Sequence, residues 1–406
     1  MLYSLALKNI LASKGRSITT FLLSLFTTVL FIVYVAFMDG SHVQIIQNSV
    51  EIYTGYGHIN VKGYEEAKDY DHLIEDAASI ETLLGKESSL AYFSPRFETY
   101  ALLSNKEISI GSMIGGIIPS KEKNLSRLQS ALIKGTYLDD NDTNAVYLGS
   151  DLAKRLKADL GDKIALIGSS LDNATAADLF TVKGIFKTGL FEFDSNSAFV
   201  NKTYLDTLMM SQNKASYFIL RFHHDKDTFK EIASLNQKLP REYEALSWKD
   251  LLSALVQAME VDSLFGYLSI SIFFLVIFFV IMIFGYVNIY TRTKQIGLLR
   301  ALGFTPGAIK KLLFGEHLIL IASSVLIGAL IGSAVSYYFH IHPILIPGLA
   351  DMYKDYGVVI DSIATDFNPL TIGWDTLAIL LLNSLSIGYP IRQINKLSVT
   401  ETMRYV

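Results

Sequence analysis

The chain has 406 residues, of which 50% are hydrophobic and only 18% are charged, and its formal net charge is −4. A water-soluble domain carries roughly 25% charged residues, so the deficit indicates segments that are buried or face lipid. This composition argues against a disordered chain, a collagen-like chain and a nucleic-acid-binding protein. Because the chain contains no cysteine, disulfides, thiolate-ligated zinc and thiol catalysis are excluded.

The N-terminal segment 1–16 carries Lys8, Lys14 and Arg16 among apolar residues at near-helical spacing. This pattern predicts a cytoplasmic amphipathic helix on the membrane surface. The alternative is that these residues form the first turns of the first membrane span.

Four segments are apolar enough to cross a bilayer, whose hydrocarbon core of about 30 Å needs roughly 20 residues of helix. They are 17–38, 263–290, 316–339 and 369–391. The fourth is the weakest, because Asp375 lies one turn inside it. Its start is well marked, however, with Asn368 as a capping residue and Pro369 at the first helical position.

Lysine and arginine in the short segments predict the orientation of the spans. Three lie in 1–16, five in the loop 291–315 and three in the tail 392–406, whereas the loop 340–368 has Lys354 alone against four aspartates. Both termini and the 291–315 loop are therefore expected in the cytoplasm, and 39–262 and 340–368 outside.

The segment 39–262 contains 23 basic and 32 acidic residues and is large enough for its own core. Strand-like runs alternate with helical ones, which favours an α+β domain, inserted between the first two spans of a four-helix membrane protein. The predicted strands are His58–Val61, Ile108–Ile110, Ala145–Leu148, Lys163–Ile167, Phe180–Phe186, Ser197–Val200 and Tyr217–Phe222.

Three helices are also expected in this segment. Ser150–Lys157 begins with a serine cap, and Phe229–Leu239 is a second helix. The third, Ser247–Met259, is expected to continue into the second span, because neither proline nor glycine lies between Trp248 and Phe265. Such a connection would be stiff.

Motifs of nucleotide-binding and hydrolytic enzymes are missing from the sequence, including the P-loop, G-x-G-x-x-G, H-E-x-x-H and G-x-S-x-G patterns. We therefore expect neither an enzyme nor a cofactor or metal bound to this chain. His223 and His224 are neighbours on a strand and point to opposite faces, so they indicate a solvated strand end.

The loop 291–315 is the most informative stretch. Lys294–Leu302 predicts an amphipathic helix, which Gly303 ends, and Thr305 with Pro306 begins a second helix that leads into the third span. Two short basic helices at the cytoplasmic face would present a compact surface to a soluble partner. The alternative is a basic loop that attaches to the membrane.

This loop resembles the coupling region of FtsX-like ABC permeases, the type VII or mechanotransmission transporters that include MacB and LolC/LolE. The resemblance rests on an R-x-x-x-I-G-L-L-R-A-L-G core that begins at Arg292, and on Glu316. The C-terminal pattern Pro390-x-Arg392 with Glu401 also resembles the family, although Ser398, Val399 and Thr402 depart from it. A short motif near the N-terminus, which ends at Arg16, resembles the start of the family's chains, and Gly57–Val61 with Gly63 and Tyr64 resembles LolE-like members.

The resemblance implies a half-transporter that pairs with a second permease, either itself or a paralogue. ATP and Mg²⁺ would be bound by separate ATP-binding subunits, against which the coupling helix would dock. The residues implied for this contact are Gln295, Ile296, Leu299, Arg300, Ala301 and Gly303. The resemblance also implies a porter-like external domain with an inserted β-rich lobe near 116–205.

Glu316 is expected where the loop re-enters the membrane, or alternatively as a first-turn carboxylate that the helix dipole favours. Gly328 and Gly332 form a G-x-x-x-G pattern in the third span. Such a pattern allows close helix approach, either to a second permease or within the chain.

The function that the resemblance implies is extraction or release of lipoproteins or another amphiphile from the bacterial inner membrane, driven by the ATPase partner. A periplasmic carrier, an adaptor, lipoprotein cargo and membrane lipid are the expected further partners. Two alternatives remain at this point: a MacB-like exporter of peptides or drugs, and an FtsX-like transmembrane regulator of a cell-wall hydrolase.

Overall fold

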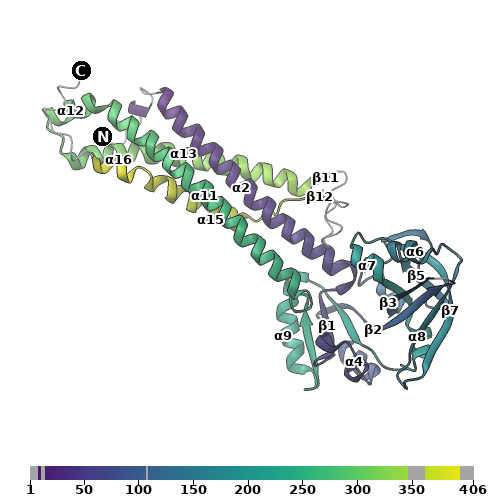
Figure 1. Cartoon of the computed structure of the whole chain (residues 1–406). Coiled ribbons are helices and arrows are strands. Elements are labelled where there is room, and N and C mark those ends of the chain that lie inside the picture. The colour runs from purple at the N-terminus through teal and green to yellow at the C-terminus, as the bar shows by residue number, and fades with distance from the viewer. Residues whose placement is uncertain (1–7, 11–13, 107, 346–361, 394–406) are drawn as a thin grey trace. The chain divides into compact units, whose positions relative to one another are not determined.

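A computed structural model describes residues 8–10, 14–106, 108–345 and 362–393. The chain divides into a helical unit and an α+β unit, and the latter comprises Gln44–Ala258 of the described residues. The remaining described residues form the helical unit. Figure 1 shows the long helices of one unit and the strands of the other.

Four helices in the described residues are long and apolar enough to cross a membrane, as the sequence predicts. They are α2 (Lys14–Ser49), α11 (Ser253–Thr291), α13 (Pro306–Ile341), and α15 (Pro369–Leu385) continued by α16 (Gly388–Gln393). The predicted start of the fourth span is confirmed, because Asn368 Oδ1 accepts a hydrogen bond from the Leu370 amide at 3.1 Å. Most of the predicted N-terminal helix and the tail motif at Leu397–Arg404 lie outside the described residues.

The helical unit is held together by apolar packing and by a small set of buried polar contacts. Phe31 of α2 meets Phe274 of α11 edge to face, with 4.7 Å between ring centroids. Asn383 of α15 donates to Ser24 Oγ of α2 at 3.2 Å, and its carbonyl accepts from His317 of α13 at 3.1 Å. Such polar contacts between apolar helices fix their rotation relative to one another.

The α+β unit contains a closed barrel of six strands. Each strand pairs with the next around the ring β2–β3–β8–β5–β7–β6, and β6 pairs again with β2. Alternate side chains point inward and bury an aliphatic and aromatic interior that includes Leu103, Val146 and Phe180. The bounds are β2 (Leu90–Asn105), β3 (Ile108–Ile117), β5 (Ala145–Gly149), β6 (Lys163–Ser169), β7 (Thr175–Phe186) and β8 (Ser197–Asn201).

A second, smaller sheet has the order β10–β1–β9–β2 and a core of its own. It comprises β1 (Gly57–Val61), β9 (Tyr217–Phe222), β10 (Tyr243–Ser247) and the first half of β2, and it packs on α4 (Ala77–Leu84) and α9 (Thr228–Lys238). Strand β2 therefore belongs to both sheets. Residues up to Arg96 pair with β9, and residues from Phe97 onward pair with β3.

The remaining elements cover these sheets or connect their strands. They are α3 (Tyr64–Ala67), α5 (Pro119–Glu122), β4 (Leu132–Gly135), α6 (Ser150–Leu156), α7 (Phe191–Asn196), α8 (Lys202–Met209) and α10 (Trp248–Leu251). The pairing of the barrel strands begins at Phe97. The inserted lobe near 116–205 that the resemblance implies stays a prediction.

The predicted strands and helices are present, but several details of the prediction are wrong. Strands β2, β4 and β10 were not predicted, and Ile108–Ile110 is only the start of the longer β3. Ser150 is the first helical residue of α6 and Gly149 is its cap, without a side-chain hydrogen bond. The helix before the second span is interrupted at Leu252, where the backbone turns out of helical geometry between α10 and α11.

Candidate functional site

The predicted coupling loop folds as a helix, a tight turn and a second helix. Helix α12 (Thr293–Ala301) ends before Gly303, whose φ of +93° is strained for any residue with a side chain. Thr305 then caps α13 by accepting a hydrogen bond from the Ala308 amide at 3.2 Å, and Pro306 occupies the first helical position. Figure 1 shows α12 at one end of the helical unit.

One face of α12 packs on the bundle and the other is open to solvent. Ile296 is only 3% exposed and lies with Ile289, Ile309 and Leu313 in a cluster that Leu299 flanks. On the opposite face, Leu298 is 58% exposed.

Four of the other residues that the resemblance implies are placed as follows. Gln295, Ala301 and Gly303 are exposed, and Arg300 is half-buried. Ile296 therefore holds the helix in place, whereas the exposed residues offer a surface.

A buried ion pair joins Arg292, the residue at the N-terminal end of α12, to Glu316 of α13. Arg292 Nη1 lies 2.6 Å from Glu316 Oε2, and Arg292 Nε donates to Gln295 Oε1 at 3.0 Å. The second Glu316 oxygen accepts from Asn9 Nδ2 at 2.6 Å. Glu316 thus connects the N-terminal segment, the loop and the third span. It is the eleventh residue of α13, so the alternative of a first-turn carboxylate is wrong.

The two glycines of the third span lie against α2 of the same chain. A Cβ atom added at Gly328 would lie 2.9 Å from the Leu25 carbonyl oxygen, and one at Gly332 would lie 3.1 Å from Cβ of Ile32. Of the two contacts weighed for this pattern, the structure contains the one within the chain.

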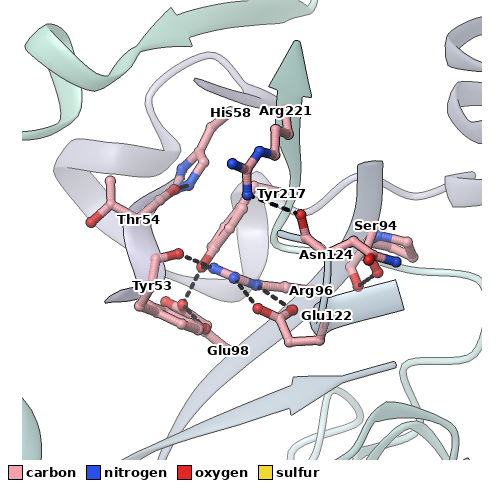
Figure 2. A network of polar contacts seen from close by, with 11 residues as sticks. Tyr53, Thr54, His58, Ser94, Arg96, Glu98, Glu122, Asn124, Tyr217 and Arg221 are labelled. Atoms are coloured by element: carbon pink, nitrogen blue, oxygen red, sulfur yellow. Dashed lines mark hydrogen bonds and ion pairs between the residues drawn. The ribbon is translucent and has the colours of Figure 1, made fainter. Parts of the chain in front are cut away.

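A polar network in the α+β unit lies where β2 leaves one sheet and enters the barrel (Figure 2). Arg96, fully buried, donates to both carboxylate oxygens of Glu122 on α5, at 2.5 and 3.1 Å, and to the Tyr53 carbonyl at 2.7 Å. Burial alone would lower the pKa of Arg96, but the adjacent Glu122 carboxylate outweighs this effect and raises it. The guanidinium is therefore a permanent cation, neutralised by Glu122.

Glu98 is the second carboxylate of this network. One of its oxygens accepts hydrogen bonds from two tyrosines, Tyr53 at 2.6 Å and Tyr217 at 2.5 Å. Burial and the charge of Glu98 raise the pKa of Tyr217, so this phenol stays protonated and remains a donor. His58 stacks on the Tyr217 ring at 4.0 Å and lies 3.3 Å from Glu65.

These side chains line a groove of about 690 Å³ within the α+β unit. Its walls come from α3, α7, α10 and strands β2 and β3. They include the aromatic or carboxylate residues Tyr53, Tyr64, Glu65, Glu98, Tyr100, Glu192, Phe193 and Tyr217. The described residues contain no group of three or more His, Asp or Glu side chains placed to hold a metal ion.

Sequence reasoning did not find this groove. Its residues come from segments that are far apart in the chain, and no spacing rule connects Tyr53, Glu98 and Tyr217. The only local signal is the unusual pairing of a proline with charged residues in Pro95-Arg96-Phe97-Glu98. Proline is rare inside paired strands and marks places where pairing changes.

Comparison with known proteins gives matches in both parts of the chain. The FtsX-like permease C-terminal family matches residues 267–399, a range that includes α12, the glycine pair and α15. The lipoprotein-releasing system transmembrane protein LolC of Neisseria meningitidis is 21% identical over 86% of this chain and 86% of its own length. LolC of Xylella fastidiosa is 22% identical over 77% of each chain.

Solved structures are also similar to the chain, although their TM-scores are low. The periplasmic region of MacB from Actinobacillus actinomycetemcomitans is 15% identical and covers 53% of this chain and 98% of its own, with a TM-score of 0.38. The extracellular domain of the transporter YknZ from Gram-positive bacteria is 15% identical over 47% of this chain and 100% of its own, with a TM-score of 0.33.

The family match covers α12, α13, α15 and much of α11, and LolC of Neisseria meningitidis aligns with 86% of the chain. Through residues 267–399 the chain is similar to the FtsX-like permeases, and over most of its length it is similar to LolC.

Proposed function

We propose that this permease couples ATP hydrolysis by a separate ATP-binding subunit to movement of its α+β domain. The observation that carries the proposal is α12, a short helix with an exposed apolar residue, Leu298, and a buried face fixed to the bundle by Ile296. Leu302, one turn further along, is 69% exposed, so the two leucines form an apolar patch at the end of the helix. Exposed apolar patches on a polar surface mark sites where another protein docks.

The buried contacts provide a route for force from α12 into the membrane helices. The Arg292–Glu316 ion pair joins α12 to α13, and Gly328 brings α13 against α2. The boundary between the two units falls inside the continuous helices α2 and α11. A displacement of α12 by its partner would therefore act on helices that continue into the α+β unit.

We further propose that the cargo is a lipoprotein or a similar amphiphile, because the LolC relatives are named as lipoprotein-releasing proteins. The protein would lie in the bacterial inner membrane with α12 and both termini in the cytoplasm, as the distribution of lysine and arginine favours. Its partners would be the ATP-binding subunit, a second permease and a periplasmic carrier or adaptor.

The docking proposal is tested by placing a charge on the exposed face of α12. We expect Leu298→Asp to abolish co-purification with the co-expressed ATP-binding subunit and to remove stimulation of its ATPase activity, because a carboxylate would be desolvated at the interface. The matched control is Ile133→Asp, which changes an apolar residue of similar exposure, 52%, in the α+β unit. If Leu298→Asp binds the subunit normally, α12 is not the docking site.

The cargo proposal has a separate test. Proteoliposomes that contain the permease pair and the ATP-binding subunit should release an acylated protein to a soluble carrier when ATP is added. ATP turnover without release would reject lipoprotein as the cargo and leave the coupling proposal intact.

A further inference from the structure

We propose that the groove of the α+β unit, together with the sheet face beside it, binds a cationic amphipathic segment of a partner polypeptide. The proposal goes beyond the proposed function and does not depend on ATP coupling. It rests on three features of the described residues: two carboxylates without a cationic partner, an aromatic lining, and an exposed apolar strip on the barrel.

The groove carries negative charge that the protein itself does not neutralise. The charge of Arg96 is already neutralised by Glu122 in their buried ion pair. Glu65 has His58 and Lys68 as its partners. The described residues provide no cation for Glu98, whose contacts are two tyrosine hydroxyls, or for the exposed Glu192 on α7. Both carboxylates line the same groove.

The aromatic residues favour an organic cation over a bare metal ion. Tyr64, Tyr100 and Phe193 line the groove, and Tyr53 already has the Arg96 guanidinium over its ring, 3.8 Å from the centroid. Aromatic faces attract arginine and lysine side chains, and a nearby carboxylate adds charge-assisted hydrogen bonds. An arginine side chain suits this lining, because its planar guanidinium stacks on aromatic rings and its charge pairs with carboxylates.

An apolar strip on the outer face of the barrel continues from the groove. Tyr100, which lines the groove, is 69% exposed and pairs with Met113. Leu102 follows Tyr100 on the same face of β2 and is 40% exposed. It pairs with Ile167 of β6, which is 39% exposed. Leu179 on the next strand, β7, is 53% exposed.

The strip and the groove together indicate the length and character of the ligand. The groove volume lies in the range of small-ligand pockets, but the strip extends beyond it across three strands. A single small cation would leave this strip uncovered, whereas a peptide with alternating apolar residues followed by a basic residue would cover both. The negative charge of the groove would repel nucleic acids and acidic peptides, so we exclude both as ligands.

The experiment measures peptide binding to the full-length protein in phosphatidylcholine nanodiscs, with empty nanodiscs subtracted. The probe is a fluorescein-labelled peptide with three alternating leucines followed by two arginines, and its partner carries citrulline, a neutral isostere, in place of arginine. We expect the arginine peptide to bind at least tenfold more tightly by fluorescence anisotropy. Glu192→Gln and Glu98→Gln should remove most of that difference without changing binding of the citrulline peptide.

The control variant is Glu66→Gln, which removes an exposed carboxylate beside Glu65 that does not line the groove. It should bind both peptides as the wild type does. Leu102→Ser tests the strip and should weaken both peptides equally. Equal binding of the two peptides, an equal loss in Glu66→Gln, or no loss in Leu102→Ser would each overturn the proposal. Because Glu192 is exposed on a surface helix, its variant keeps the test informative if Glu98→Gln does not fold.

Discussion

At the scale of single residues, two buried ion pairs connect segments that are distant in sequence. Arg96 and Glu122 join β2 to α5 at the junction of the two sheets, and Arg292 and Glu316 join α12 to α13. Desolvation of two charges offsets much of their attraction, so such pairs add little net stability. Removing one partner is costly, however, because the other charge stays buried. The pairs therefore fix geometry more than they stabilise the fold.

This physical asymmetry gives the first prediction. Arg292→Met should destabilise the helical unit by about 3–5 kcal/mol, because Glu316 is left as an unpaired buried carboxylate. The double variant Arg292→Met with Glu316→Met should recover much of the thermal stability and still couple poorly to ATP hydrolysis. The measurements are the thermal unfolding midpoint in detergent and the stimulated ATPase rate.

Lys311→Met provides the matched control, because Lys311 is an exposed cation on α13, the helix that contains Glu316. It should change neither measurement. A double variant that is as unstable as the single one would show that the pair itself, and not the unpaired charge, determines stability at this site.

At the scale of elements, the third span depends on close approach to the first. Gly328 and Gly332 allow α13 to lie against Leu25 and Ile32 of α2 at distances that a side chain would obstruct. Apolar helices in lipid associate through such packing, because lipid tails are as apolar as the side chains they replace. The glycine pair thus holds together the two helices that our proposed force path joins.

The second prediction concerns this contact. Gly328→Ala should destabilise the bundle by about 1–3 kcal/mol, since its Cβ would meet the Leu25 backbone, which cannot rotate away. Gly315→Ala on the same helix is the control, because a Cβ there has nothing within 4 Å. It should be neutral or stabilising by up to about 1 kcal/mol, as alanine favours helix. Equal unfolding midpoints for the two variants would contradict the packing assignment.

At the scale of the whole molecule, the charge distribution predicts the orientation in the membrane. The basic residues outside the large 39–262 segment lie mostly in the two tails and the 291–315 loop, whereas 39–262 has an acidic excess. Positively charged loops are retained in the cytoplasm during insertion. The small formal net charge of −4 therefore arises from segments of opposite sign, which this rule predicts on opposite sides of the membrane.

The third prediction uses the absence of cysteine, which makes the natural protein a clean background for labelling. A single Lys230→Cys in the α+β unit should react in intact spheroplasts with a membrane-impermeant maleimide, and Lys294→Cys in α12 should react only after permeabilisation. Both lysines are exposed, so accessibility within the fold does not distinguish them. The reverse labelling pattern would invert the proposed topology.

How far the sequence predicts this protein depends on whether the signal is local. Long uncharged runs determine the four membrane helices, because a helix in lipid must be apolar over the full thickness of the hydrocarbon. Gly303, Thr305 and Asn368 mark the element ends where they were expected, since turns and caps depend on adjacent residues. The family resemblance of the coupling loop is likewise carried by a contiguous motif.

Tertiary structure decided what depends on contacts between distant segments. The long strand β2 escaped prediction because Pro95 interrupts its pattern at the point where it changes partners from β9 to β3. Only helix packing decides that Gly328 and Gly332 lie against α2. The same holds for the pairing of Glu316 with Arg292. The groove is likewise absent from any local pattern, because Tyr53, Glu98 and Tyr217 meet only when the barrel closes and the small sheet pairs with it. Sequence by itself determined the four membrane helices and the helix–turn–helix of the 291–315 loop, and the fold decided the internal connections and the groove.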